Sequence, residues 1–148
     1  MKKFKFKLDT PLKIKRMKEK IEIQKLAETI TTKENEQKQL KSLKRIALDT
    51  REDLDEVLVD YSKAKDLYSF NIYMNNLKNL VERQKTVVNK AEELYNLTRL
   101  SYIEKRRDKE ILEKLEEKSF QAYSKELDKE EQNLSDESGS LAFNRRER

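Results

Sequence analysis

The 148-residue sequence has very few of the residues that build tight turns. Gly139 and Pro11 are its single glycine and its single proline. Sheet and α/β folds need many tight turns, and such turns draw heavily on these two residue types. The sequence therefore comes close to excluding both fold classes, and it leaves either long helices or disorder.

Cysteine and histidine are absent altogether. The first absence excludes a disulfide, a thiolate ligand and a cysteine nucleophile, and the second removes the commonest general base and metal ligand. Adjacent glutamates such as Glu92 and Glu93 do not face each other on a helix, and they lie among lysines. We therefore expect a non-enzymatic protein that has no metal or other cofactor and no small-molecule substrate.

Long apolar runs are absent as well. Val57, Leu58 and Val59 form one of the longest, whereas a membrane helix needs about 20 apolar residues. Lys5 and Lys7 interrupt the apolar stretch that a signal peptide would need. We therefore expect a soluble, cytoplasmic protein.

Charge of both signs is abundant. Charged residues make up 43% of the chain, yet 34 basic and 29 acidic residues leave a net charge of only +5. Disorder is favoured by low hydrophobicity combined with high net charge, and only the first condition applies here. A composition rich in lysine and glutamate, combined with heptad spacing, is typical of coiled coils. The spacing of the apolar residues therefore decides between long helices and disorder.

Apolar residues recur in two long heptad rows, with steps of alternately three and four residues. The first row is Leu40, Leu43, Ala47, Thr50, Leu54, Val57, Tyr61, Ala64 and Tyr68. The second row is Met74, Leu77, Val81, Gln84, Val88, Ala91, Tyr95, Thr98 and Tyr102. A parallel stripe of Tyr73, Leu80, Val87 and Leu94 widens the second face. Rows of this length predict coiled-coil helices.

The two rows do not share one register, because the first row continued beyond Tyr68 meets polar residues. The heptad register must therefore change near the midpoint of the chain. We predict an all-α fold in which two long helices form an antiparallel coiled-coil hairpin. Its expected parts are a basic lead-in over 1–11, a first helix over 12–67, a reversal at 68–72, a second helix over 73–135 and a flexible tail over 136–148. One uninterrupted helix that dimerises is the alternative.

The charges of the two chain ends favour the hairpin. Residues 1–20 carry nine basic and two acidic side chains, a net charge of +7. Residues 113–148 carry seven basic and ten acidic side chains, a net charge of −3. An antiparallel fold places these ends side by side, although exposed charge pairs contribute little and salt screens them.

Two clusters are candidates for contact with a partner. The lead-in interleaves Phe4 and Phe6 with lysines, a pattern that also suits nucleic acid or an anionic membrane surface. The second cluster gathers near the expected reversal and consists of Tyr68, Phe70, Tyr73 and Met74. It is either a contact site or core. A generic coiled-coil adaptor, which would bind partner helices through its heptad rows, is a further alternative.

Motifs along nearly the whole chain resemble those of a known family. They are Phe4-x-Phe6-x-Leu8-x-x-x-Leu12 at the start, Leu58-Val-Asp-Tyr61 before the midpoint, Tyr73-Met-x-x-Leu77-x-x-Leu80-Val-x-x-Gln84 after it, and Leu112-x-x-Leu115, Glu131-Gln132 and Asp136-Glu137 late in the chain. In this order they resemble the flagellar FliJ proteins, which are soluble stalk and chaperone components of the flagellar type III export apparatus.

This resemblance implies an antiparallel two-helix coiled coil that is similar to the central stalk of rotary ATPases. The joined termini would sit in the pore of a hexameric export ATPase and promote its assembly and activity. The tip would contact the cytoplasmic domain of a membrane export gate protein, and export chaperones would be further partners. We thus expect a role in flagellum biogenesis and motility at the inner face of the cell membrane, with no nucleic acid as partner.

The resemblance also implies two sets of contact residues. The pore-side set, at the termini, is Lys3, Phe4, Lys5, Phe6, Lys7, Lys13, Lys15 and Arg16. The tip-side set, for the export gate, is Leu54, Leu58, Tyr61, Tyr73, Leu77, Leu80 and Gln84. Several tip-side residues also belong to the heptad rows, so the sequence leaves contact and packing roles open.

Overall fold

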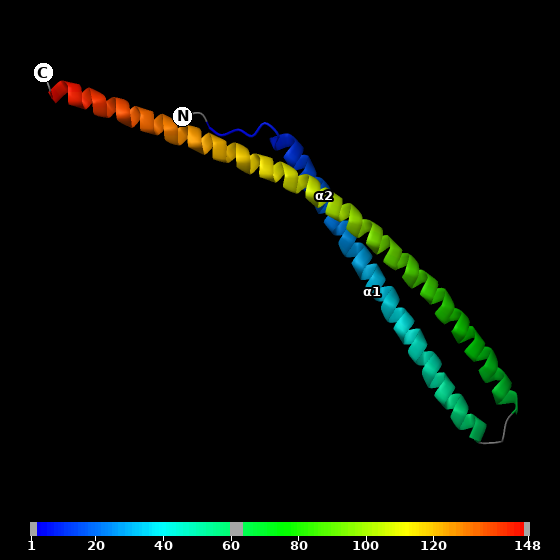
Figure 1. Cartoon of the computed structure of the whole chain (residues 1–148). Coiled ribbons are helices and arrows are strands. Elements are labelled where there is room, and N and C mark those ends of the chain that lie inside the picture. The colour runs from blue at the N-terminus through cyan, green and yellow to red at the C-terminus, as the bar shows by residue number, and fades with distance from the viewer. Residues whose placement is uncertain (1–2, 60–63, 147–148) are drawn as a thin grey trace. The chain divides into compact units, whose positions relative to one another are not determined.

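In the computed structural model, which describes residues 3–59 and 64–146, the chain forms two helices (Figure 1). Helix α1 spans Asp9–Val59 and helix α2 spans Ala64–Arg146. These described residues contain no strand, and no helix among them is long and apolar enough to cross a membrane. The prediction of an all-α fold with two long helices is confirmed.

Helix α1 begins at a turn that contains proline. Asp9 is its first residue, and the Leu12 amide donates a hydrogen bond to the Leu8 carbonyl at 3.0 Å. Pro11 is tolerated because amides in the first turn have no partner within the helix. The helix thus starts three residues before the predicted position 12. It then continues through the polar stretch 31–39, which contains no glycine or proline to break it.

The predicted reversal at 68–72 is wrong, because these residues lie in the first turns of α2. Helix α1 correspondingly ends at Val59 rather than at residue 67. Serine and asparagine recur over 69–76, but each costs a helix only about 0.5 kcal/mol relative to alanine. The packing of Phe70 and Met74, which are partly buried, outweighs that cost. Residues 60–63 lie outside the described part of the chain.

The predicted flexible tail over 136–148 is helical as far as Arg146. Gly139 alone does not end α2, because one glycine costs a helix only about 1 kcal/mol. The flanking serines keep their hydroxyls bonded within the helix: Ser138 donates to the Leu134 carbonyl at 2.8 Å and Ser140 to the Glu137 carbonyl at 3.3 Å. Every side chain over 128–143 is exposed.

The chain divides into two compact units. Unit 1 contains Met1–Lys20 and Glu104–Arg148, and unit 2 contains Ile21–Ile103. Each helix passes through both units, so each unit holds one part of α1 and one part of α2.

In unit 2 the two helices run antiparallel. Lys33 places its Nζ 4.0 Å from the ring centre of Tyr95, and Gln37 Nε2 donates a hydrogen bond to Glu92 at 3.0 Å. The residue number on α1 therefore rises as that of its partner on α2 falls. This antiparallel pairing is expected of a hairpin and not of a coiled coil of two parallel helices.

The two heptad rows supply the core of unit 2. Thr50, Leu77 and Val88 are buried, and the Thr50 hydroxyl is satisfied by the Ile46 carbonyl at 2.8 Å. Eleven further row members are partly buried: Leu40, Leu43, Ala47, Leu54, Met74, Val81, Gln84, Ala91, Tyr95, Thr98 and Tyr102. Tyr68 is the exception among the row members whose burial the structure describes, since it lies on α2 rather than on α1 and is exposed.

Unit 1 is also antiparallel, and Leu12 forms its centre. Arg16 pairs with Glu113, whereas Glu19, further along α1, pairs with Lys109. Leu12 has no exposed surface and is the largest side chain so fully buried among the described residues. The packing of unit 1 therefore depends strongly on this single leucine.

Candidate partner-binding surfaces

Residues 3–8, the described part of the lead-in that precedes α1, are held against α2 by aromatic side chains. The Phe4 ring meets Phe120 edge to face, with ring centres 5.3 Å apart, and it meets Tyr123 at 5.5 Å. Phe6 is buried. Aromatic pairs of this geometry contribute about 0.5–1.5 kcal/mol beyond the area that they bury. The two phenylalanines of the pore-side set thus anchor the lead-in.

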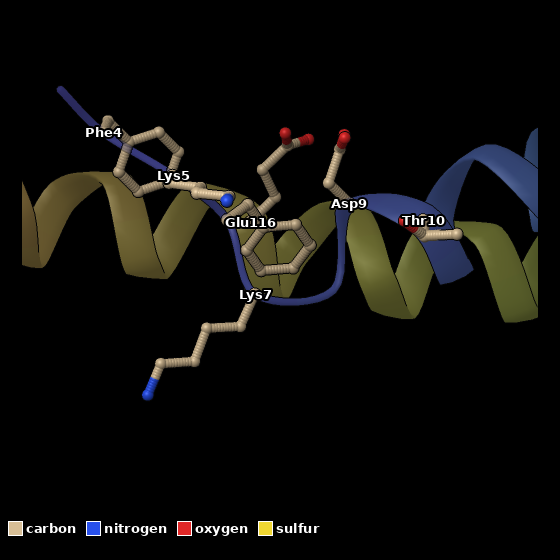
Figure 2. A pocket seen from close by; sticks show the side chains of 7 residues that line it. Phe4, Lys5, Lys7, Asp9, Thr10 and Glu116 are labelled. Carbon is tan, nitrogen blue, oxygen red and sulfur yellow. The ribbon is translucent and has the colours of Figure 1, made fainter.

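The lysines of the lead-in remain exposed. Lys3, Lys5 and Lys7 alternate with the anchored phenylalanines. Figure 2 shows Phe4 against the helix and the Lys7 side chain extending away from it. A hollow of about 640 Å³ lies here, lined by residues 4–7, Asp9, Thr10 and Glu116. The alternation therefore separates anchoring side chains from charges that are free to meet a partner.

The remaining cations of the pore-side set form ion pairs within unit 1. Lys13 Nζ lies 2.7 Å from Asp9, one turn away on α1. Lys15 Nζ lies 2.6 Å from Asp108 of α2. Arg16 reaches two carboxylates of α2, Glu113 at 3.3 Å and Glu116 at 3.6 Å. Lys15 and Arg16 therefore join the two helices.

Sequence reasoning missed one further pair of this interface. Lys109 Nζ lies 2.7 Å from a Glu19 carboxylate oxygen, and both side chains are mostly buried. The hydrogen bond from Lys109 to Glu19 raises the pKa of Lys109. The hydrogen bond from Lys15 lowers the pKa of Asp108. The opposite net charges of residues 1–20 and 113–148 did not signal these two contacts, because Asp108 and Lys109 lie outside the second range and Glu19 is an acidic residue of the basic end.

The Lys15–Asp108 pair predicts a pH dependence. A carboxyl whose pKa is lowered in the folded state stabilises that state above its unfolded pKa of about 3.9, and the contribution is lost as the pH falls through the lowered value. Asp108→Asn should therefore lower the melting temperature slightly at pH 7. As the pH falls through the lowered pKa of Asp108 its carboxylate is neutralised, so the difference in melting temperature between the variant and the wild type should shrink. Circular dichroism melts measure this, and a difference that persisted in acid would contradict the assignment.

The tip-side set divides by burial. Leu77 is only 4% exposed and belongs to the core of unit 2, and Leu54 is partly buried. Gln84 Nε2 donates hydrogen bonds to Glu36, at 3.1 Å to its carbonyl and at 2.6 Å to its carboxylate. These three residues pack within the molecule. Tyr61 lies outside the described residues.

The exposed members of the tip-side set are Leu58, Tyr73 and Leu80, whose exposed fractions are 51%, 49% and 45%. Tyr73 and Leu80 belong to an exposed row on α2, in which an apolar residue recurs at every seventh position. The row consists of Tyr73, Leu80, Val87 and Leu94. The stripe that was expected to widen the packed face is therefore open. An unpacked apolar row of this length is typical of a surface that meets another protein.

Within each unit, these contacts define an antiparallel two-helix coiled coil that presents charged and apolar surfaces. Over 3–59 and 64–146, no group of His, Cys, Asp and Glu could hold a metal ion. The chain belongs to the flagellar FliJ family: the family model described as "Flagellar FliJ protein" matches residues 4–148. It therefore has a role related to flagellar protein export. No curated protein and no solved structure matches the chain.

Proposed function

We propose that the chain is a non-enzymatic stalk and coupling factor of the flagellar type III export apparatus. In this role the ends of the chain sit in the pore of a hexameric export ATPase and promote assembly and activity of its ring. The exposed tip-side residues contact the cytoplasmic domain of the membrane export gate, and export chaperones are further partners. The protein would act at the inner face of the membrane at the flagellar base. The observation that carries the proposal is the family match, which covers both helices.

The pore-side role is supported by unit 1. Phe4 and Phe6 fix the lead-in while its lysines stay exposed. Exposed charges accelerate encounter with an oppositely charged surface more than they strengthen the final complex. Unit 1 thus offers an exposed basic surface to the pore that we propose as its partner.

The export role is tested by adding the full-length chain to the purified export ATPase. We expect the rate of ATP hydrolysis to rise with added chain until the sites on the ring are filled, and we expect more ATPase to sediment as hexamers. Because the effect needs a basic surface, it should weaken as salt is raised. An unchanged hydrolysis rate at saturating chain would contradict the stalk role.

The gate contact is tested by the double variant Tyr73→Ala/Leu80→Ala. Both side chains are exposed, so helicity and the melting temperature should change little, since surface substitutions usually stay within about 0.5 kcal/mol. Affinity for the cytoplasmic domain of the gate protein should fall by about tenfold or more, as expected when two apolar anchors are removed. Calorimetric titration measures it.

A matched control is Val87→Ala/Leu94→Ala, which removes the two row residues that lie further from the start of α2. If the gate contact is confined to the tip side, this control binds like the wild type. Equal losses from both variants would place the gate contact along the entire exposed row. Unchanged binding of the first variant would remove the tip-side assignment.

A further inference from the structure

A second surface of unit 2 lies away from the exposed row. It is a groove of about 360 Å³ between α1 and α2, lined by Lys44, Ala47, Leu48, Arg51, Met74, Lys78, Val81 and Glu82. Four of these residues are apolar, namely Ala47, Leu48, Met74 and Val81. The other four are charged, and three of them are cations. We call this surface the cationic groove.

The cationic groove and the exposed row lie on opposite flanks of the packed face of α2. Successive residues of an α-helix are turned by about 100°. Counted from the buried Leu77, Tyr73 and Leu80 fall on one flank, whereas Lys78 and Val81 fall on the other. A partner on the exposed row would therefore leave the cationic groove accessible.

The cations of the groove lack carboxylate partners in the described part of the chain. Lys44, Arg51 and Lys78 are exposed and form no ion pair there. Glu82, by contrast, is held by Lys85 at 2.6 Å, which leaves its charge compensated. The groove therefore keeps an excess of positive charge beside its apolar lining residues, of which Leu48 is 61% exposed.

The spacing of the cations matches that of a helix. Lys44 and Arg51 are seven residues apart on α1, which is two turns or about 10.5 Å at 1.5 Å per residue. A helix lying along the groove would present carboxylates at the same interval, with a bulky apolar side chain between them. Apolar grooves between helices commonly bind the apolar face of a further amphipathic helix.

We propose that the cationic groove binds an acidic amphipathic helix of a partner protein. Its carboxylates pair with Lys44, Arg51 and Lys78, and its apolar side chain packs on Leu48 and Met74. A membrane surface fits less well, because recruitment to anionic lipid uses clusters of about four to eight basic residues and the groove has three beside a carboxylate. The proposal rests on the groove alone and does not require the export role.

The test uses a fluorescent synthetic helical peptide of about 20 residues, long enough to be helical on binding, that repeats Glu-x-x-Leu-x-x-x-Glu. Its anisotropy is followed on addition of the full-length chain. We expect saturable binding, and we expect a peptide with lysine in place of the glutamates not to bind. The chain variant Lys44→Glu/Lys78→Glu should bind the acidic peptide about tenfold or more weakly, since two attractive charges become repulsive.

The control variant is Lys38→Glu/Lys90→Glu, which makes the same change in net charge at exposed lysines outside the groove. It should bind the acidic peptide like the wild type. Equal losses from both variants, or no saturable binding to the wild type, would overturn the proposal. Two other results would also overturn it. If the chain binds anionic lipid vesicles but not the peptide, and Lys44→Glu/Lys78→Glu abolishes this binding, the groove meets a membrane. If the same variant abolishes self-association in sedimentation, the groove meets a second copy of the chain.

Discussion

Leu12→Ala is expected to cause a large loss of stability in unit 1. Leu12 has no exposed surface, and replacing a buried leucine by alanine costs about 2–5 kcal/mol through lost burial and the cavity that remains. Since whole domains are stable by only about 5–15 kcal/mol, unit 1 should open locally. Hydrogen exchange should then become fast over 9–20 and over 104–127.

The matched control for this variant is Ile14→Ala, two residues further along α1. Ile14 is 48% exposed, so its replacement should change stability by no more than about 0.5 kcal/mol. Slow exchange in Leu12→Ala, or equally fast exchange in both variants, would show that Leu12 is not the centre of the packing of unit 1.

Deletion of residues 1–16 is expected to abolish the stimulation of the export ATPase. The deletion removes the anchors Phe4 and Phe6 and the buried Leu12. It also removes Lys15 and Arg16, which form ion pairs with α2. Both the basic surface and the packing of unit 1 are lost with it. The measurement is the rate of ATP hydrolysis at saturating chain.

A triple variant separates the charge from the fold. Lys3→Gln/Lys5→Gln/Lys7→Gln removes exposed cations and keeps the aromatic anchors. Because exposed ion pairs contribute roughly 0.2–1 kcal/mol each, we expect about tenfold more chain to be needed for half-maximal stimulation. Full stimulation by the deletion variant would contradict the pore-side role, and unchanged potency of the triple variant would exclude its lysines from the contact.

The core of unit 2 could be predicted from the sequence because a heptad period assigns burial to one face of a helix. The buried Thr50, Leu77 and Val88 all lie in the predicted rows. The reversal could not be placed in the same way. Polar residues such as Ser69 and Asn71 are compatible with both a turn and a helix, and packing decides between the two.

The contact residues show a different limit of sequence reasoning. Leu77 and Leu80 are both leucines of the same motif, yet one is buried and the other is nearly half exposed. Lys7 and Lys15 are both lysines of the basic N-terminal segment, yet the first is exposed and the second pairs with Asp108. Only the partner helix distinguishes these cases. A sequence defines which residue types a surface contains, but interhelical contacts decide which of them remain available.

The pairing of α1 with α2 inside one molecule is tested most directly by spin labels at Lys38→Cys and Lys90→Cys, in a chain that has no other cysteine. Neighbouring antiparallel helices, with axes about 8–10 Å apart, should give an interlabel distance of roughly 20–30 Å. That distance should persist when labelled chains are diluted with unlabelled ones. One continuous helix would instead separate the labels by 52 residues, or about 78 Å at 1.5 Å per residue. That long distance, or a short one that disappears on dilution, would contradict the hairpin.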